Sequence, residues 1–385
     1  MSLLFFMLTV AYAVTVLLFI TGFLRKSPAD YTGQPAVSVV IAARNEERHL
    51  PHLLADLQHQ TYPNFEVIVV NDRSTDGTLA ILEAVSTQFP RLRFLSIEAV
   101  PAGISPKKYA LTQAIAVASG EIICTTDADC RVGRGWVAGL IKSFHPSVGM
   151  VLGFTAVIPP LGQTKPNFIN RLQMMDYLAM VTSARGVCQL GNAFGASGRN
   201  LAYRKQAFEE VGGFTAVMHR LSGDDVLLLQ LIRQRTRWKI RFADDPASFN
   251  QTYAEPTLKR LLSQRIRWAS NSTPQIQLNP LFFTFLALVA LVSNLLFWYP
   301  VVSFWLAGYW FDYLRLGAVK LAVDALLCTL GAFHFKQRKT LLIFPVWFIL
   351  HIPYVVSMGV LGIWGKFSWK ETVNWRDYHR RTRRN

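Results

Sequence analysis

Three short polar motifs follow one another along this chain of 385 residues, and together they could act on a phosphorylated substrate. An Asp-Ala-Asp triplet occupies positions 127–129, a Gly-Asp-Asp triplet positions 223–225, and a Gln-Arg-Ile-Arg-Trp segment positions 264–268. Paired carboxylates bind hard divalent cations, a further carboxylate can remove a proton, and guanidinium groups bind phosphate oxygens. The order of the motifs therefore predicts a metal–diphosphate clamp, then a general base, then a cationic closure.

The first motif comes directly after an apolar run at 122–124. Side chains two residues apart on an extended segment point to the same side, so Asp127 and Asp129 could both face Mg²⁺ or Mn²⁺. Such a cation would neutralise a diphosphate leaving group. A pair of aspartates at the end of a strand can also serve only as a turn. The two later motifs favour the metal site.

The second motif precedes a helix that we expect at 226–234. Asp224 and Asp225 could simply complement the positive end of that helix dipole. Alternatively, one carboxylate is held near a like charge in a partly dry cleft, where its proton affinity suits it to deprotonate a hydroxyl group. Asp225 is the candidate base in this interpretation, and Asp224 supports it.

The elements that must position these motifs indicate an α/β domain between Pro35 and about Asn279, because short apolar strands alternate with amphipathic helices. We expect a largely parallel sheet, with ligands at the carboxyl ends of its strands, where Arg44, Asp72 and Asp127 fall. No Gly-x-Gly-x-x-Gly follows the first strand and no P-loop motif occurs, so a nucleotide would be held by metal and side chains. The expected strands are 36–43, 65–71, 93–98 and 121–126, and the expected helices are 46–60, 76–89, 108–118 and 256–270.

Long apolar segments flank this domain, and the chain combines a mean hydropathy of +0.24 with only 17% charged residues. Lys320 and Asp324 interrupt one segment, at a cost in lipid unless they pair at helix spacing or face protein. The first segment has no charged residue and is about as long as the roughly 20 residues that span the hydrocarbon of a bilayer. The segments are 3–24, 281–311, 316–333 and 341–365.

The formal net charge of +16 is concentrated beside these segments, as at Arg25 and Lys26 and in the tail at 380–384. Basic flanks mark the cytoplasmic side of membrane proteins. We therefore expect a retained anchor with its N-terminus outside, a cytoplasmic catalytic domain, an anionic membrane surface nearby and no nucleic acid partner. The four cysteines lack paired metal spacing and predict buried, reduced thiols.

Three spans after a cytoplasmic domain would leave the basic tail outside, which conflicts with the distribution of positive charge. Two alternatives remain open at this point. One of the last segments lies in the interface or re-enters, or the 281–311 segment folds as two short passes.

The motifs, together with the strand end at 69–78 (Val-Val-Asn-Asp-Arg-Ser-Thr-Asp-Gly-Thr), resemble the membrane-bound family 2 glycosyltransferases over residues 37–271. The resemblance implies a GT-A fold, and the architecture is similar to ceramide and diacylglycerol glycosyltransferases and to polysaccharide synthases. It also implies that Asp72 contacts the nucleotide base and that Lys108 contacts a phosphate or the base. Arg199 departs from the pattern, because it stands where the family has a small residue beside the acceptor wall.

The resemblance assigns further roles to individual residues. Gln264 and Arg267 would face the diphosphate, and Trp268 would form a wall for the acceptor. The predicted catalytic residues are Asp225 and Asp224; the predicted metal ligands are Asp127 and Asp129; and the predicted nucleotide-binding residues are Arg44, Glu46, Asp72, Lys108, Asp127, Asp129, Gln264, Arg267 and Trp268. The predicted domains are an N-terminal anchor (1–26), a cytoplasmic GT-A domain (35–255), an amphipathic interfacial segment (256–279), C-terminal membrane segments (281–365) and a basic cytoplasmic tail (366–385).

The favoured function is that of an inverting, metal-dependent glycosyltransferase, which moves a sugar from a nucleotide-sugar, expected to be a UDP-sugar, to a lipid or lipid-linked acceptor. A processive polysaccharide synthase is the alternative, and its few membrane segments would then require a homo-oligomer or a partner subunit. A non-catalytic nucleotide-sugar-binding membrane protein is a more distant alternative, because a protein that only binds its ligand needs no base.

Overall fold

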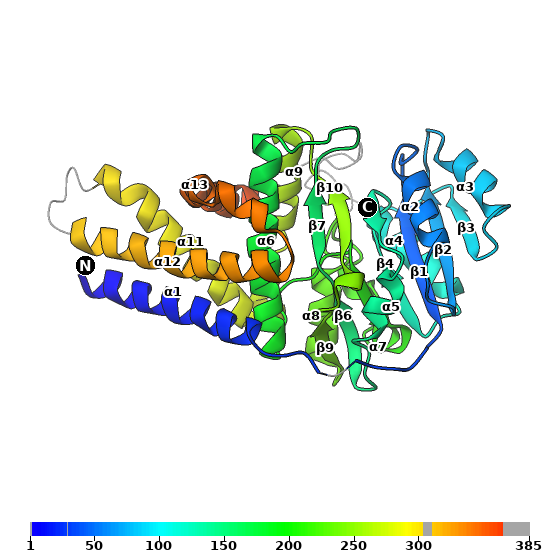
Figure 1. The fold of residues 1–385 in the computed structure, drawn as a ribbon, viewed down its shortest axis with the longest axis horizontal. Helices are drawn as coiled ribbons and strands as arrows, with labels where there is room; N and C mark the ends of the chain where they lie inside the picture. Colours follow the sequence, from blue (N-terminus) through cyan, green and yellow to red (C-terminus); the bar gives the residue numbers. More distant parts are fainter. Residues whose placement is uncertain (1, 29, 303–309, 365–385) are drawn as a thin grey trace. The chain divides into compact units, whose positions relative to one another are not determined.

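The computed structural model describes residues 2–28, 30–302 and 310–364 (Figure 1). Their contacts divide the chain into two compact units, and each is described by itself. We call the first the sheet unit; it comprises the described residues of 26–161 and 195–253. We call the second the helical unit; it comprises the described residues up to 25, 162–194 and those from 254 onward. The predicted tail at 366–385 lies outside the described residues.

The sheet unit is built on a seven-stranded sheet with the order β3-β2-β1-β4-β8-β6-β9. Four neighbouring pairs in it are parallel, and β8 is antiparallel to both of its neighbours. This mostly parallel arrangement confirms the predicted α/β class. The strands are β1 (Val37–Ala43), β2 (Phe65–Asp72), β3 (Leu92–Ile97), β4 (Ile122–Thr125), β6 (Val148–Leu152), β8 (Leu201–Arg204) and β9 (Lys239–Phe242).

A second, three-stranded sheet has the order β5-β10-β7, from Cys130–Val132, Asn250–Tyr253 and Thr155–Ile158. Because β4 belongs to the large sheet and β5 to the small one, the Asp-Ala-Asp motif spans the link between the two sheets. The motif therefore follows a buried strand directly, as expected.

Helices cover the large sheet. They are α2 (Leu50–Gln58), α3 (Thr78–Ser86), α4 (Pro106–Val117), α5 (Trp136–Ile141), α7 (Lys205–Glu210) and α8 (Val226–Arg235), with 3₁₀ turns at Thr215–Val217 and Pro246–Ser248. The helix expected from residue 46 begins only at Leu50, after a turn at residues 47–49. The backbone N–H of Glu46 donates to Thr78 Oγ1 at 2.9 Å and ties this turn to the start of α3.

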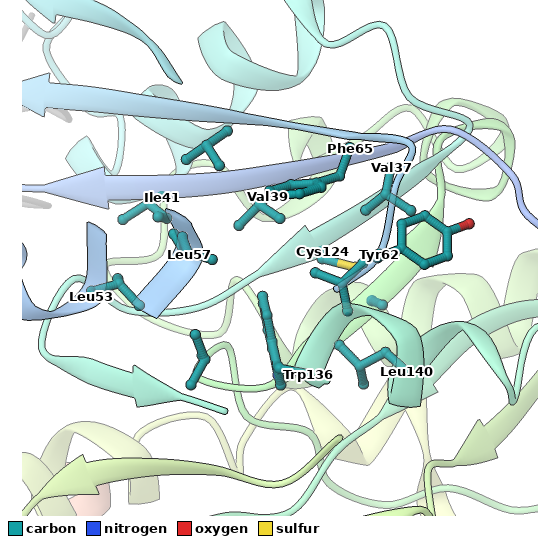
Figure 2. Packing of buried hydrophobic residues seen from close by; sticks show 14 of the residues in the cluster. Val37, Val39, Ile41, Leu53, Leu57, Tyr62, Phe65, Cys124, Trp136 and Leu140 are labelled. Atoms are coloured by element: carbon teal, nitrogen blue, oxygen red, sulfur yellow. The ribbon is translucent and has the colours of Figure 1, made fainter. Parts of the chain in front are cut away.

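Strand β1 is buried on both faces, which explains its continuous apolar run. Val39 and Ile41 are fully buried and share one core cluster with Leu53 of α2 and Trp136 of α5 (Figure 2). Alternate residues of β1 lie toward the other face, against which α4 packs. Parallel pairing of β1 with β2 and β4 places Arg44, the residue after β1, at the carboxyl edge of the sheet.

The helical unit contains the long apolar helices of the part of the chain that the structure describes. It consists of α1 (Ser2–Phe23), α6 (Phe168–Gln189), α9 (Leu258–Ala269), α10 (Gln275–Leu278), α11 (Pro280–Val302), α12 (Trp310–His334), a 3₁₀ segment (Arg338–Ile343) and α13 (Phe344–Trp364). Four segments among the described residues are long and apolar enough to cross a membrane: Leu3–Phe23, Pro280–Val301, Trp310–His334 and Arg338–Gly362.

Helix α6 departs from the expected domain boundaries, because it lies within the predicted 35–255 domain but belongs to the helical unit. It packs against α1 and α12. Gly22 of α1 and Gly186 of α6 allow the two backbones to touch, since a Cβ at Gly22 would lie 2.1 Å from the Gly186 carbonyl oxygen. The apolar face of α6 packs against these partners. The segment therefore belongs to the helical unit and not to the sheet unit.

Lys320 and Asp324 in α12 form the ion pair that their spacing predicts, with Nζ and Oδ2 2.5 Å apart. Tyr12 of α1 completes the cluster: its hydroxyl donates to Asp324 at 2.8 Å and accepts from Lys320 at 2.9 Å. The two charges therefore face protein and each other.

The two-pass alternative for 281–311 is wrong over the described residues 281–302, because α11 is a single helix that continues through Pro300. Residues 303–309 of that segment lie outside the described residues. Helix α13 runs in a different direction from α1 and α12, since Figure 1 shows α13 nearly along its axis while the other two lie across the view. It packs mainly against α11 and α9.

Candidate active site

The loops after β1 and β2 hold three predicted nucleotide-binding residues, Arg44, Glu46 and Asp72. Asp72 is 4% exposed, and its carboxylate accepts from Arg73 Nε at 2.8 Å. Glu46 is also buried, and its carboxylate lies 3.1 Å from His49 Nδ1. The three residues come from adjacent strand ends, as expected.

Hydrogen bonds join these two loops to each other. The Thr75 backbone N–H donates to Asn45 Oδ1 at 2.8 Å, and the Glu47 N–H donates to Asp76 Oδ2 at 3.1 Å. Asn45 and Arg73 adopt left-handed backbone conformations, with φ of 54° and 53°. Strained residues of this kind persist where the surroundings hold them, often at ligand sites.

The carboxylates of Asp127 and Asp129 are half-buried, whereas Ala128 between them is 3% exposed. Asp127 Oδ1 accepts from Lys107 Nζ at 2.8 Å, and Asp127 Oδ2 lies 3.8 Å from Arg199 Nε. The motif thus lies beside two basic side chains that the sequence motifs did not predict.

Lys107 joins the first motif to the second, because its Nζ also lies 2.8 Å from Asp224 Oδ2. Burial opposes its charge, but attraction by Asp127 and Asp224 raises the pKa of Lys107 well above its usual range. Lys107 therefore stays charged. The resemblance placed the predicted contact at Lys108 instead, and the pair of lysines at the start of α4 was the signal that could have pointed to Lys107.

Lys108 has a different environment. Its side chain is fully buried, and its ammonium donates to the carbonyl oxygens of Arg220 at 2.6 Å and Ser222 at 2.8 Å. Burial lowers the pKa of Lys108 to about 8. In this geometry Lys108 supports the loop that leads to Asp224, and a nucleotide contact by Lys108 stays a prediction.

Asp225 caps the N-terminus of α8, where its Oδ1 accepts from the Val226 N–H at 2.6 Å. Its Oδ2 accepts from the Gly198 N–H at 3.0 Å. Burial and the nearby charge of Asp224 raise the pKa of Asp225, although Lys107 and the two N–H groups oppose the shift. A buried carboxylate with raised proton affinity suits a general base.

Gly198 lies between these groups, because a Cβ at this position would be 2.9 Å from Asp224 Oδ2 and 3.4 Å from Lys107 Nζ. Gly198→Ala should therefore displace the Asp224 carboxylate. We expect the rate of the proposed transfer to fall by roughly 10- to 100-fold, because small misplacements of catalytic groups reduce rates by this much. Because only flexible side-chain ends must move, the melting temperature should change little.

Gly133→Ala is the matched control, since a Cβ there meets no atom within 4 Å. Steady-state rates and thermal melts of both variants check the prediction. An alanine at 198 that leaves the rate at the parent value would show that this carboxylate cluster tolerates displacement.

The third motif lies on α9 in the helical unit, on the amphipathic helix that the sequence predicts. Gln264 Nε2 donates to Glu255 Oε1 at 2.7 Å. The guanidinium of Arg265 lies over the Trp268 ring at 4.3 Å. The structure thus brings Asp127, Asp224 and Asp225 together in the sheet unit, whereas Gln264, Arg267 and Trp268 belong to the other unit.

The residues at the Asp-Ala-Asp motif fit a divalent cation that is shared with a substrate. Among the described residues, no group of three or more His, Cys, Asp or Glu side chains could hold a metal alone. Mg²⁺ typically takes one or two carboxylates and completes its shell with substrate phosphates and water. Asp127 and Asp129 supply such a pair of hard oxygen donors.

A family model described as Glycosyl transferase family 21 matches residues 2–385. The chain belongs to glycosyl transferase family 21. The predicted assignment to family 2 is not confirmed, although family 2 and family 21 are both glycosyltransferase families.

Curated relatives match about three fifths of this family 21 chain. The beta-monoglucosyldiacylglycerol synthase of Nostoc sp. (strain PCC 7120) is 29% identical over 237 residues, which cover 61% of this chain and 48% of that protein. The poly-beta-1,6-N-acetyl-D-glucosamine synthase of Staphylococcus epidermidis is 25% identical over 241 residues, covering 60% and 53%. The chain thus spans about half the length of these relatives.

Among solved structures, the mannosyltransferase PcManGT of Pyrobaculum calidifontis, in complex with GDP-Man and Mn²⁺, matches with a TM-score of 0.60. It is 20% identical and covers 94% of this chain and 99% of that chain. This likeness supports the GT-A-like fold of the family 21 chain.

Proposed function

We propose that the chain is an inverting, metal-dependent glycosyltransferase, which moves a sugar from a nucleoside diphosphate sugar to a hydroxyl group of a membrane lipid. The observation that carries this proposal is the cluster in which Lys107 bridges Asp127 and Asp224 beside Asp225. It places a base candidate and a metal-ligand candidate on one charged network. We expect a UDP-sugar as the donor.

In the proposed reaction, the acceptor oxygen attacks the anomeric carbon while its proton passes to the Asp225 carboxylate. The bond between the anomeric carbon and the diphosphate oxygen breaks, and the diphosphate carries away the electron pair. A cation bound at Asp127 and Asp129 would neutralise this leaving group. The N–H groups of Gly198 and Val226 orient the base, and Lys107 and Arg199 add positive charge next to Asp127.

The remaining predicted residues complete this proposal. Arg44, Glu46 and Asp72 would hold the nucleoside at the ends of β1 and β2. Gln264 and Arg267 would close over the diphosphate, and Trp268 would present its aromatic face to the acceptor.

A lipid acceptor is favoured by two independent facts. Four helices among the described residues could cross a membrane, and the Nostoc relative is named beta-monoglucosyldiacylglycerol synthase. The processive alternative has support in the name of the Staphylococcus relative. Only a few helices would have to form a channel for a polymer, so we favour single transfer to lipid.

The direction of α13 suggests how the chain sits in the bilayer. If α1, α11 and α12 span it and α13 lies in the interface, the predicted tail at 366–385 falls on the side where Arg25 lies. This topology satisfies the expected distribution of positive charge, with a cytoplasmic catalytic domain.

The test uses the full-length protein in vesicles of defined lipids, with Mn²⁺ and radiolabelled donors (UDP-glucose, UDP-galactose, UDP-N-acetylglucosamine and GDP-mannose). We expect label in the organic phase, and mass spectrometry should identify a lipid carrying one added hexose unit. Label confined to a water-soluble polymer would establish the processive alternative, and no transfer from any donor would favour a protein that only binds nucleotide-sugars.

A further inference from the structure

A continuous set of contacts joins α6, α9 and α13 within the helical unit. Arg265 Nη2 lies 2.9 Å from Asp176 Oδ2, and the Arg265 guanidinium stacks on Trp268. The ring of Tyr177 lies 6.5 Å from the ring of Trp268. Asp176 accepts a hydrogen bond from Trp347, whose ring lies tilted against that of His351 with the ring centroids 4.5 Å apart. We call these residues the α6–α9–α13 cluster: Asp176, Tyr177, Arg265, Trp268, Trp347 and His351.

Three polar atoms of this cluster are buried and make no hydrogen bond among the residues that the structure describes: Tyr177 Oη, Arg265 Nη1 and His351 Nδ1. Tyr177 and Arg265 are each only 4% exposed. Buried polar groups are nearly always paired, because leaving one unpaired costs free energy. Three such atoms in one connected cluster, one on each helix, indicate a polar ligand that completes their hydrogen bonds.

The side chains of the cluster indicate which kind of ligand it binds. Asp176 offsets the charge of Arg265. The pair therefore offers hydrogen bonds but no net positive charge that would attract a phosphate. Tyrosine and arginine donate to hydroxyl and carbonyl oxygens, and tyrosine also accepts from a hydroxyl group. Exposed apolar side chains on two of the same helices, Leu262 of α9 and Ile349 of α13, offer surface to acyl chains.

We propose that the α6–α9–α13 cluster binds the uncharged headgroup of the lipid acceptor, through its hydroxyl and carbonyl oxygens. This inference rests on the proposed transfer to lipid, and it selects diacylglycerol-like or amide-linked lipids over lipid phosphates. Arg265 also positions Trp268, because its guanidinium covers one face of the indole. Arg265, which lies between Gln264 and Arg267 in the third motif, thus takes part in acceptor binding.

Tyr177→Phe removes a single unpaired oxygen and keeps the ring that packs near Trp268. We expect the KM for the lipid acceptor to rise by about tenfold, the effect of one lost hydrogen bond. The KM for the donor and the melting temperature should stay at the parent values. The measurement uses the full-length protein in mixed micelles, with dioleoylglycerol, ceramide and undecaprenyl phosphate as acceptors.

Tyr299→Phe is the matched control, because Tyr299 is 5% exposed and also lies in the helical unit. Its buried hydroxyl likewise has no hydrogen-bond partner among the described residues. Tyr299 packs against Phe5 and Tyr313, away from the cluster. A higher acceptor KM for dioleoylglycerol or ceramide in the Tyr177 variant alone would support the proposal.

Two results would overturn the proposal while leaving lipid transfer intact. One is an unchanged acceptor KM in the Tyr177 variant, which would mean that water satisfies these atoms. The other is undecaprenyl phosphate as the preferred acceptor, which would refute the uncharged headgroup. Absence of any glycolipid product would instead refute the proposed function on which this inference rests.

Discussion

Asp225→Asn should lower the rate of sugar transfer by roughly 10²-fold or more, the usual contribution of a general base. Asparagine caps helices about as well as aspartate, so α8 should still begin at the same residue. Its one amide oxygen can accept from only one of the Val226 and Gly198 N–H groups, whereas Asp225 accepts from both with its two oxygens. We therefore expect unchanged donor affinity and a slightly lower melting temperature, with the loss of rate confined to turnover.

The pH dependence of the parent protein provides the second readout. Burial and Asp224 raise the pKa of Asp225. In the proposed reaction Asp225 acts in its ionised form. The rate should thus increase with pH through an apparent pKa above that of an ordinary aspartate. The two carboxylates interact, so this apparent pKa belongs to the pair.

Asp224→Asn separates the two causes of that shift. Removing the neighbouring negative charge should move the acidic limb to lower pH, while burial still keeps the pKa above its ordinary value. Stopped assays over a pH series check this expectation. An Asp225→Asn variant that transfers sugar at the parent rate would reassign the base, first to Asp224.

Asp129→Asn should abolish the part of nucleotide binding that depends on the metal. We expect the affinity for UDP in Mn²⁺ to fall by at least about tenfold, since even an outer-shell partner of a metal contributes that much. Binding of UDP in the presence of a chelator should match that of the parent protein. Isothermal titration calorimetry with UDP, with and without Mn²⁺, measures both quantities.

Asp245→Asn is the matched control, because Asp245 is also a partly exposed carboxylate of the sheet unit that pairs with a lysine, Lys142. It lies in a turn, where asparagine can replace it as a cap. Equal UDP affinities in Mn²⁺ for the Asp129 variant and the parent would remove Asp129 from the metal site.

The local pattern of the chain was sufficient to predict the first half of the sheet unit. Strands β1 to β4 lie within about one residue of their expected bounds, because buried parallel strands produce continuous apolar runs. The edge where Arg44, Asp72 and Asp127 end up follows from strand direction alone. The four apolar helices follow from their length and composition.

Helix α6 and the shorter strands were not predicted. Strands of three to five residues, such as β5 and β8, carry too few residues for a period of two to stand out. The apolar face of α6 resembles that of any amphipathic helix, so its pattern predicts burial without naming the partner. Only packing against α1 and α12 assigns it to the helical unit.

The sequence by itself determined which residue types could do the chemistry, because carboxylate pairs and an arginine–tryptophan motif carry their chemistry in their side chains. Only the tertiary structure decided which side chains meet. Lys107 and Lys108 are adjacent in the chain, yet successive side chains of a helix point about 100° apart, and so one reaches Asp127 and Asp224 while the other supports a loop. In the same way, the proton affinity of Asp225 depends on burial and on Asp224, which are properties of the folded chain.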